Sequence, residues 1–290
     1  METKKTSKSI WRKIFYFPLT RIIIGLVACV AVVKIGQLGL AKLLDHSSIS
    51  HEYKTLISVL VAAIIVLLVY INLYRYYEKR KISELSTDKL AKNLVTGVLL
   101  GFVLQSLTIG VIYLNKGFSV ISVNSVAYLI PSFGMVTAAI FEELLFRGII
   151  FRITEEKLGS YIALAISALI FGALHLLNPN STLVSGLAVA IEAGLLLGAA
   201  YIYTRNLWFP IGIHFAWNFT QSGIYGASTS GSAISKSLLT TKIGGPVIIS
   251  GGQFGPESSI QAVIFCLIAT VILMVLNHRQ NKIIKPYWIK

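Results

Sequence analysis

Polar residues within long apolar runs could perform acid–base chemistry, and the sharpest group is Glu142-Glu143 followed by Arg147. Glu143 and Arg147 are four residues apart, so on a helix they share a face and can form an ion pair. This pairing leaves Glu142 as the freer carboxyl, roughly 100° away around the helix. A free carboxyl in an apolar setting is suited to act as a general base.

Two histidines and an asparagine supply further polar groups in two other apolar runs. His175 follows Phe171 by four positions, and Asn218 follows His214 by the same spacing. Because residues four apart lie on one helix face, His214 and Asn218 point the same way. Imidazole and amide groups can hold a water molecule, a metal ion or a developing oxyanion.

A structural reading of these residues is also open. Interhelical hydrogen bonds stabilise membrane bundles by roughly 0.6–2 kcal/mol each, and Glu143 with Arg147 could be a buried ion pair alone. Ionisable groups are nevertheless costly inside a bilayer. Three polar groups on three separate runs therefore favour one shared reactive site.

The runs that carry these residues are long enough to cross a membrane. The 290-residue chain is 55% hydrophobic and 13% charged, with a mean hydropathy of +0.74, whereas soluble domains carry roughly 25% charged residues. A spanning helix needs roughly 20 apolar residues. The sequence thus predicts an all-α, polytopic membrane helical bundle with about eight transmembrane helices. The expected spans are 19–43, 55–74, 93–114, 132–153, 159–177, 183–204, 208–225 and 260–277.

The net charge of +14 could indicate nucleic-acid binding, but the basic residues occur in short clusters between apolar runs. Nineteen Lys and Arg residues fall on the side that would hold both termini, and five fall on the other side. This asymmetry predicts cytoplasmic termini. We therefore expect a multi-pass protein of the cell membrane, in contact with membrane lipids and without a nucleic-acid partner.

The predicted organisation is one transmembrane domain between two basic tails. The tails are 1–18 and 278–290, both cytoplasmic, and the transmembrane domain is 19–277, with its catalytic core at about 131–225. A Gly- and Ser-rich outer loop, 226–259, precedes the last span. Glycines there permit tight backbone turns.

The order E-E-x-x-x-R, F-x-x-x-H, H-x-x-x-N, over about Phe133 to Asn218, resembles the CPBP intramembrane proteases. That group includes type II CAAX prenyl endopeptidases and bacterial enzymes linked to bacteriocin processing and self-immunity. The segment G-G-Q-F-G-P-E, which ends at Glu257, is similar to the outer loop of many bacterial members. The resemblance implies an endopeptidase that hydrolyses a peptide bond of a membrane-associated peptide or protein tail.

The resemblance also implies roles for the site residues. Glu142 would activate a water molecule, with His175 as its partner. The oxyanion of the tetrahedral intermediate would be stabilised by His214 and Asn218, and the site would be oriented by Glu143 and Arg147.

A zinc ion is an alternative to metal-free activation of water. Glu142, His175 and His214 would form a two-histidine, one-carboxylate set with an open position. Their spacing differs from H-E-x-x-H, which places two ligands on one helix. We favour glutamate activation of water and leave the metal open.

Depth in the membrane is the main geometric difficulty. At 1.5 Å of rise per residue, Glu142 lies near mid-span, His175 nearer the outer end and His214 nearer the cytoplasmic start. Convergence requires the connector 206–210 to dip inward or the fourth and fifth spans to be offset. Glu192 and Lys34 also lie within spans; Glu192 could hydrogen-bond His175 or be protonated, and Lys34 could snorkel or pair with Glu192.

Two other functions are compatible with the sequence. The first is a non-catalytic membrane scaffold or bacteriocin self-immunity protein with the same fold. The second is a proton-coupled transporter whose buried Glu and His residues relay protons. The chain has no clear internal repeat, and repeats are common among transporters, which disfavours the second alternative.

Overall fold

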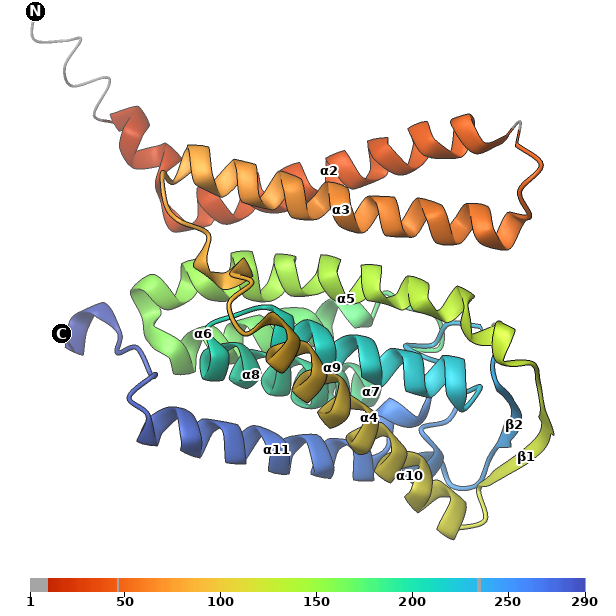
Figure 1. Ribbon diagram of the computed structural model, residues 1–290. Helices are drawn as coiled ribbons and strands as arrows, with labels where there is room; N and C mark the ends of the chain where they lie inside the picture. Colours follow the sequence, from red (N-terminus) through yellow and green to blue (C-terminus); the bar gives the residue numbers. More distant parts are fainter. Residues whose placement is uncertain (1–9, 46, 234–235, 290) are drawn as a thin grey trace, which may run out of the picture.

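The computed structural model describes residues 10–45, 47–233 and 236–289, which form a helical bundle with one small sheet (Figure 1). Residues 1–9 of the predicted basic tail, residues 234–235 of the outer loop and residue 290 lie outside the described residues.

The α-helices are α2 (Pro18–Asp45), α3 (His51–Tyr77), α4 (Leu90–Leu114), α5 (Met135–Glu143), α6 (Arg152–His175), α7 (Leu183–Val189), α8 (Leu196–Thr204), α9 (Trp208–Asn218), α10 (Val247–Ser250) and α11 (Ile260–Arg279). Three segments are π-helical: η4 (Leu144–Phe151), η5 (Ala190–Leu195) and η6 (Phe219–Ile224). Short 3₁₀ turns are η1 (Ser83–Leu85), η2 (Val126–Leu129), η3 (Pro131–Gly134), η7 (Pro256–Ser258) and η8 (Tyr287–Ile289). Strand β1 (Phe118–Val123) pairs antiparallel with β2 (Leu239–Ile243).

The predicted all-α membrane bundle is confirmed. Among the described residues, six helical segments are long and apolar enough to cross a membrane. They are Pro18–Asp45, His51–Tyr77, Leu90–Leu114, Val126–His175, Leu183–Thr204 and Ile260–Arg279. The number differs from the expected eight because one segment contains two predicted spans, and because α9 with η6 is too short to qualify.

The 50-residue segment Val126–His175 folds back on itself. The rings of Phe146 and Phe171 lie 4.7 Å apart, whereas 25 residues of straight helix would separate them by about 37 Å. The reversal occurs at Gly159, whose φ of 77° and ψ of 169° are non-helical. A Cβ at Gly159 would approach the Pro286 nitrogen to 2.7 Å, so both the backbone conformation and the packing of the C-terminal segment require glycine.

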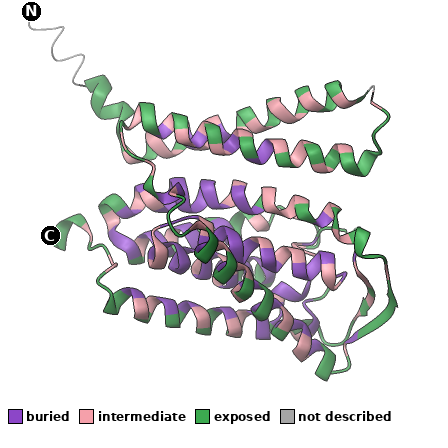
Figure 2. Ribbon diagram, in the orientation of Figure 1, coloured by how far each residue is buried: buried purple, intermediate pink, exposed green. Residues whose placement is uncertain are grey.

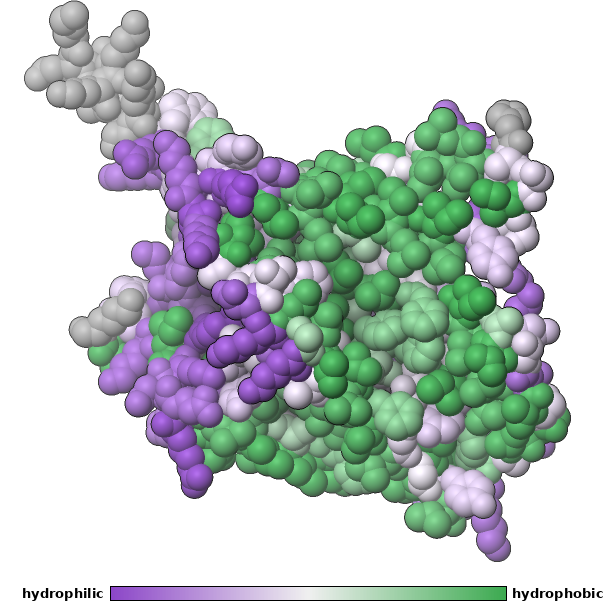
Figure 3. Space-filling model, viewed as in Figure 1, coloured by the Kyte–Doolittle hydropathy of each residue, from purple (hydrophilic) through white to green (hydrophobic). Residues whose placement is uncertain are grey.

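Burial divides the molecule into a dense core and an outer hairpin. Figure 2 shows buried residues concentrated in the bundle around α6, α8 and α9, while α2 and α3 are largely exposed or intermediate. In the most apolar window of Leu183–Thr204, 67% of residues are buried, against 17% in that of α2. The exposed apolar side chains form a hydrophobic band over the face seen in Figure 3, next to a hydrophilic end.

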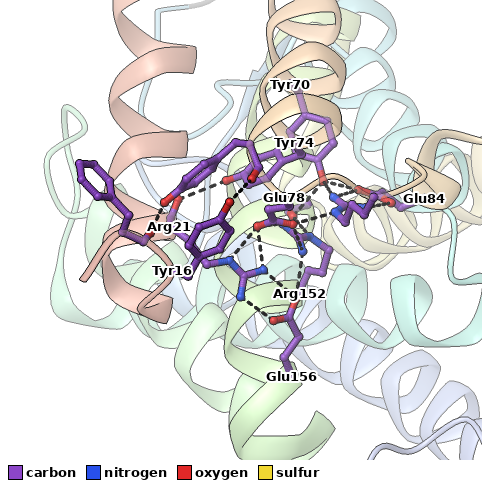
Figure 4. Close-up of polar contacts among 12 residues, drawn as sticks. Tyr16, Arg21, Tyr70, Tyr74, Glu78, Glu84, Arg152 and Glu156 are labelled. Atoms are coloured by element: carbon purple, nitrogen blue, oxygen red, sulfur yellow. Dashed lines mark hydrogen bonds and ion pairs between the residues drawn. The ribbon is translucent and has the colours of Figure 1, made fainter. Parts of the chain in front are cut away.

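The hydrophilic end is held together by buried ion pairs, here named the basic-end cluster (Figure 4). Its members are Arg21, Tyr70, Glu78, Arg80, Glu84, Arg152 and Glu156. Glu78, just after α3, pairs with Arg21 of α2 at 2.7 Å and with Arg152 of α6 at 3.0 Å. The cluster therefore joins the α2–α3 hairpin to the core. Helix α2 begins and helix α11 ends at this same end of the bundle, on opposite sides of the core (Figure 1).

Candidate active site

The ion pair expected from spacing lies where α5 continues into η4. Arg147 Nη1 donates a hydrogen bond to Glu143 Oε1 at 2.8 Å, and both side chains are fully buried. Arg147 Nη2 also donates to the carbonyl oxygens of Ala193 at 2.9 Å and Gly194 at 3.1 Å. Both carbonyls belong to η5, and π-helical turns frequently occur at functional sites. Arg147 therefore ties two π-helical segments together.

His214 of α9 lies between the two adjacent glutamates. Its Nδ1 donates to Glu143 Oε1 at 3.0 Å, and its Nε2 lies 3.8 Å from Glu142 Oε2. Since a carboxylate only accepts hydrogen bonds, Nδ1 carries a proton. Glu142 retains 28% of its side-chain exposure, whereas Glu143 has none. Glu142 is thus the freer carboxyl, as the spacing predicts.

Glu142 and His214 meet because they lie at about the same distance from the basic end of the bundle. Glu142 lies ten residues before Arg152 and His214 lies eight residues after Asn206, both of which anchor at the basic end. A rise of 1.5 Å per residue places both side chains about 12–15 Å along the bundle. The connector 206–210 does not need to dip, since Asn206 Nδ2 donates to the Ser86 carbonyl at 2.8 Å near the basic end.

Phe171 forms the wall shared by the two histidines. His175 Nδ1 donates to the Phe171 carbonyl at 2.8 Å, which leaves its Nε2 available. The Phe171 ring lies 4.5 Å from that of His175 and 6.3 Å from that of His214. The Arg147 guanidinium stacks on Phe171 at 4.9 Å. His175 makes no hydrogen bond with Glu142, so their expected partnership is not a direct contact here.

A small cavity joins the histidines to two further acids. Its volume is about 40 Å³, and its wall includes His175, His214, Asn218, Glu192 and Glu257. Such a volume holds a few water molecules. Glu142 is not part of this wall, but its Oε2 lies 3.8 Å from the Nε2 atom of His214, which is part of it. The sequence predicted no role for Glu257, although its position after Gly-Pro at the end of the outer loop could have indicated one.

Glu257 closes the cavity from the outer loop. Its Oε1 accepts from the Ser230 backbone N–H at 2.5 Å, and its Oε2 accepts from Gln221 Nε2 at 3.0 Å. Burial raises the pKa of Glu257 to about 7, although the hydrogen bonds from Ser230 and Gln221 oppose that rise. Glu257 therefore changes charge near neutral pH.

Glu192 lies in the cavity wall and is 4% exposed. It does not pair with Lys34, which lines a separate groove between α2 and α3. Several buried polar atoms of this region have no hydrogen-bond partner among the described residues. They are Glu142 Oε2, Glu143 Oε2, Arg147 Nε and Glu192 Oε2. Buried polar atoms normally have partners, so the region can bind water or a polar substrate group.

The zinc alternative lacks a ligand set in this geometry. Within the part of the chain that the structure describes, no group of three His, Cys, Asp or Glu side chains could hold a metal ion. Glu142, His175 and His214 share the region but do not converge on one point. We therefore derive no step that involves a metal.

Comparison with known families agrees with this arrangement. Residues 124–220 match the family model described as "Type II CAAX prenyl endopeptidase Rce1-like", and this range includes all seven residues of the three motifs. No curated protein and no solved structure matches the chain. The match indicates a protease of the CAAX type in general, and the six long apolar helical segments of the described residues indicate a multi-pass membrane protein. The match at residues 124–220 supports the resemblance to the CPBP intramembrane proteases.

Proposed function

We propose that the protein is an endopeptidase that cleaves a membrane-associated peptide or protein tail with a water molecule activated by Glu142. The observation that carries this proposal is the contact chain Arg147–Glu143–His214–Glu142, in which only Glu142 remains partly exposed. A general base needs a free carboxyl within reach of water.

Glu142 would accept a proton from water as the oxygen attacks the scissile carbonyl carbon. His214 is held by Glu143 through Nδ1, so its Nε2 faces the region where the substrate would react. A doubly protonated His214 would balance the charges of Glu142, Glu143 and Arg147, and its Nε2–H could then donate to the oxyanion. Asn218, one turn further along, would supply a second donor.

His175 would hold the attacking water from the opposite wall. Its Nδ1 is committed to the Phe171 carbonyl, which fixes the ring and leaves Nε2 as an acceptor. The separation between His175 and Glu142 fits an interaction through water, and the 40 Å³ cavity beside His175 has room for it.

We further propose that both termini are cytoplasmic and that the protein resides in the cell membrane. The basic loops gather at one end of the bundle, whereas Glu257 and Ser230 of the outer loop cover the cavity. This orientation favours small secreted peptides or their leaders as substrates. A role in bacteriocin self-immunity is compatible with catalysis.

The test is cleavage by the purified protein in lipid nanodiscs, with products identified by mass spectrometry. Glu142→Gln should lower the rate roughly 100- to 10,000-fold, and His175→Ala should lower it comparably. Glu52→Gln, a half-exposed glutamate paired with Lys236, serves as the matched control and should cleave like the wild type. Unchanged product formation by Glu142→Gln would remove the assigned base.

Chelation separates the two mechanisms of water activation. We expect cleavage to persist after treatment with a strong zinc chelator, because the described site has no metal ligand set. Loss of activity that zinc alone restores would favour the metal-dependent alternative.

A further inference from the structure

The cavity wall contains a buried carboxyl group, Glu192, that the proposed mechanism does not use. Glu192 lies within η5 and is only 4% exposed. It lines the cavity together with His175 and His214. Its Oε2 has no hydrogen-bond partner among the described residues, and none of them forms an ion pair with it. A side chain this buried and without a partner is not explained as a structural contact.

The surroundings of Glu192 favour its neutral form. The Arg147 guanidinium donates to the carbonyls of Ala193 and Gly194, the two residues that follow Glu192, but it forms its ion pair with Glu143. The other acid in the cavity wall is Glu257, which cannot neutralise a carboxylate at Glu192. An unpaired carboxylate in such a setting is costly, whereas a carboxylic acid is not. Glu192 therefore holds a proton that it can donate.

Glu257 differs from Glu192 in a way that separates their functions. Both Glu257 oxygens accept hydrogen bonds from protein donors, Ser230 N–H and Gln221 Nε2. Glu257 is thus fixed as part of the cavity roof. Glu192 has an oxygen free to meet a group that enters the cavity.

We propose that Glu192 is a further catalytic residue, which protonates the leaving amine of the cleaved peptide bond. This inference rests on the proposed function. Glu142 takes one proton from water as the C–O bond forms. The C–N bond of the tetrahedral intermediate then breaks, and its nitrogen takes the proton of the Glu192 carboxyl. The proton held by Glu142 passes through water to the Glu192 carboxylate, which restores both groups.

The decisive measurement compares two substrates with the same acyl half. One has a peptide bond, whose alkyl amine leaves only after protonation, and the other is a p-nitroanilide, whose weakly basic amine needs little assistance. Glu192→Gln keeps the shape of the side chain but has no proton to donate. We expect it to lower peptide cleavage roughly 100-fold or more and anilide cleavage less than about tenfold.

Because both substrates are measured in the same sample, any inactive fraction of Glu192→Gln cancels from the ratio. Glu192→Asp retains a carboxylic acid and should recover part of the peptide cleavage. Glu155→Gln is the matched control, since Glu155 is buried but pairs with Arg205 at the basic end; its substrate ratio should equal that of the wild type.

Each outcome has a separate meaning. If the wild type cleaves neither substrate, or if Glu142→Gln cleaves both like the wild type, the proposed function fails and this inference fails with it. If the wild type cleaves, Glu142→Gln does not, and Glu192→Gln retains the wild-type substrate ratio, only the role of Glu192 is overturned.

Discussion

Two clusters of Glu and Arg residues in the same molecule have opposite degrees of hydrogen-bond saturation. In the basic-end cluster, Glu84 accepts from Tyr70 and Arg80, and Glu78 accepts from Arg21, Arg80 and Arg152. No buried side-chain atom of that cluster lacks a partner. The site cluster of Glu142, Glu143, Arg147, His214 and Glu192 leaves four such atoms unpaired among the described residues.

The difference indicates what each cluster does. A fully paired cluster in a partly wet region stabilises the packing of helices, because each charge finds an opposite charge. An incompletely paired cluster in a dry region is a cost to stability, and such a cost is expected where water and substrate must bind. Saturation with hydrogen bonds, more than residue type, therefore distinguishes the ion pairs of the basic-end cluster from those of the proposed active site.

The largest expected effect comes from breaking the buried pair of the site. Arg147→Ala removes the ion pair of the fully buried Glu143 and leaves this carboxyl only its contact with His214, so we expect a loss of about 3–5 kcal/mol of stability together with loss of cleavage. Thermal unfolding in detergent and peptide cleavage measure the two effects. The double variant Glu143→Gln/Arg147→Met should recover part of the stability but not the cleavage, and an Arg147→Ala protein as stable as the wild type would contradict the assignment.

A smaller effect, confined to stability, is expected at the basic end. Glu84→Ala removes the acceptor of Arg80 and Tyr70 and should cost about 2–3 kcal/mol, while cleavage per folded molecule stays unchanged. Glu156→Ala is the matched control, because Glu156 is 40% exposed and such pairs contribute less than about 1 kcal/mol. Equal losses of unfolding free energy in both variants would show that the number of hydrogen bonds to a glutamate does not set its contribution to stability in this cluster.

Disturbing the close packing of α6 beside the site should lower the cleavage rate, and it should lower stability by less than the two changes above. A Cβ at Gly172 of α6 would lie 2.3 Å from the Gly186 carbonyl oxygen and 2.7 Å from the Ala190 Cβ. Gly172→Ala should therefore separate α6 from η5, cost about 1–3 kcal/mol and slow cleavage by displacing His175. Gly110→Ala, where a Cβ meets nothing within 4 Å, should be neutral or slightly stabilising. Both are measured by unfolding and by cleavage rate, and equal behaviour of the two would contradict the close approach.

The smallest effect is a pH dependence in the outer loop. The folded-state pKa of Glu257 is about 7, against an ordinary value of 4.5, so its contribution to stability is full below pH 4.5 and is lost as pH rises through about 7. The charge that forms lies near Glu192 and His214. Protease nicking of the loop 226–259 should increase several-fold between pH 5 and pH 8, and Glu257→Gln should abolish that increase. A pH response that persists in Glu257→Gln would assign it to another group.

Much of this arrangement follows from local sequence. Apolar runs of about 20 residues must form helices in a bilayer, because every backbone polar group there needs a partner. The spacing of Glu143 and Arg147 fixes their pairing on one helix face, and the same pairing leaves Glu142 exposed. The two spans expected at 132–153 and 159–177 lie within one helical segment, Val126–His175, which reverses at Gly159.

Only the tertiary structure brought distant residues to one cavity. Nothing in the spacing of Glu192 and Glu257, 65 positions apart, indicates that both face His175 and His214. Likewise, the carbonyls of Ala193 and Gly194 become partners of Arg147 through contact between η4 and η5. Local sequence determines which side chains are too polar for lipid, because that cost depends on residue type alone. Which of them remain without a partner depends on the packing of helices far apart in the chain, and this packing decided where the candidate site lies.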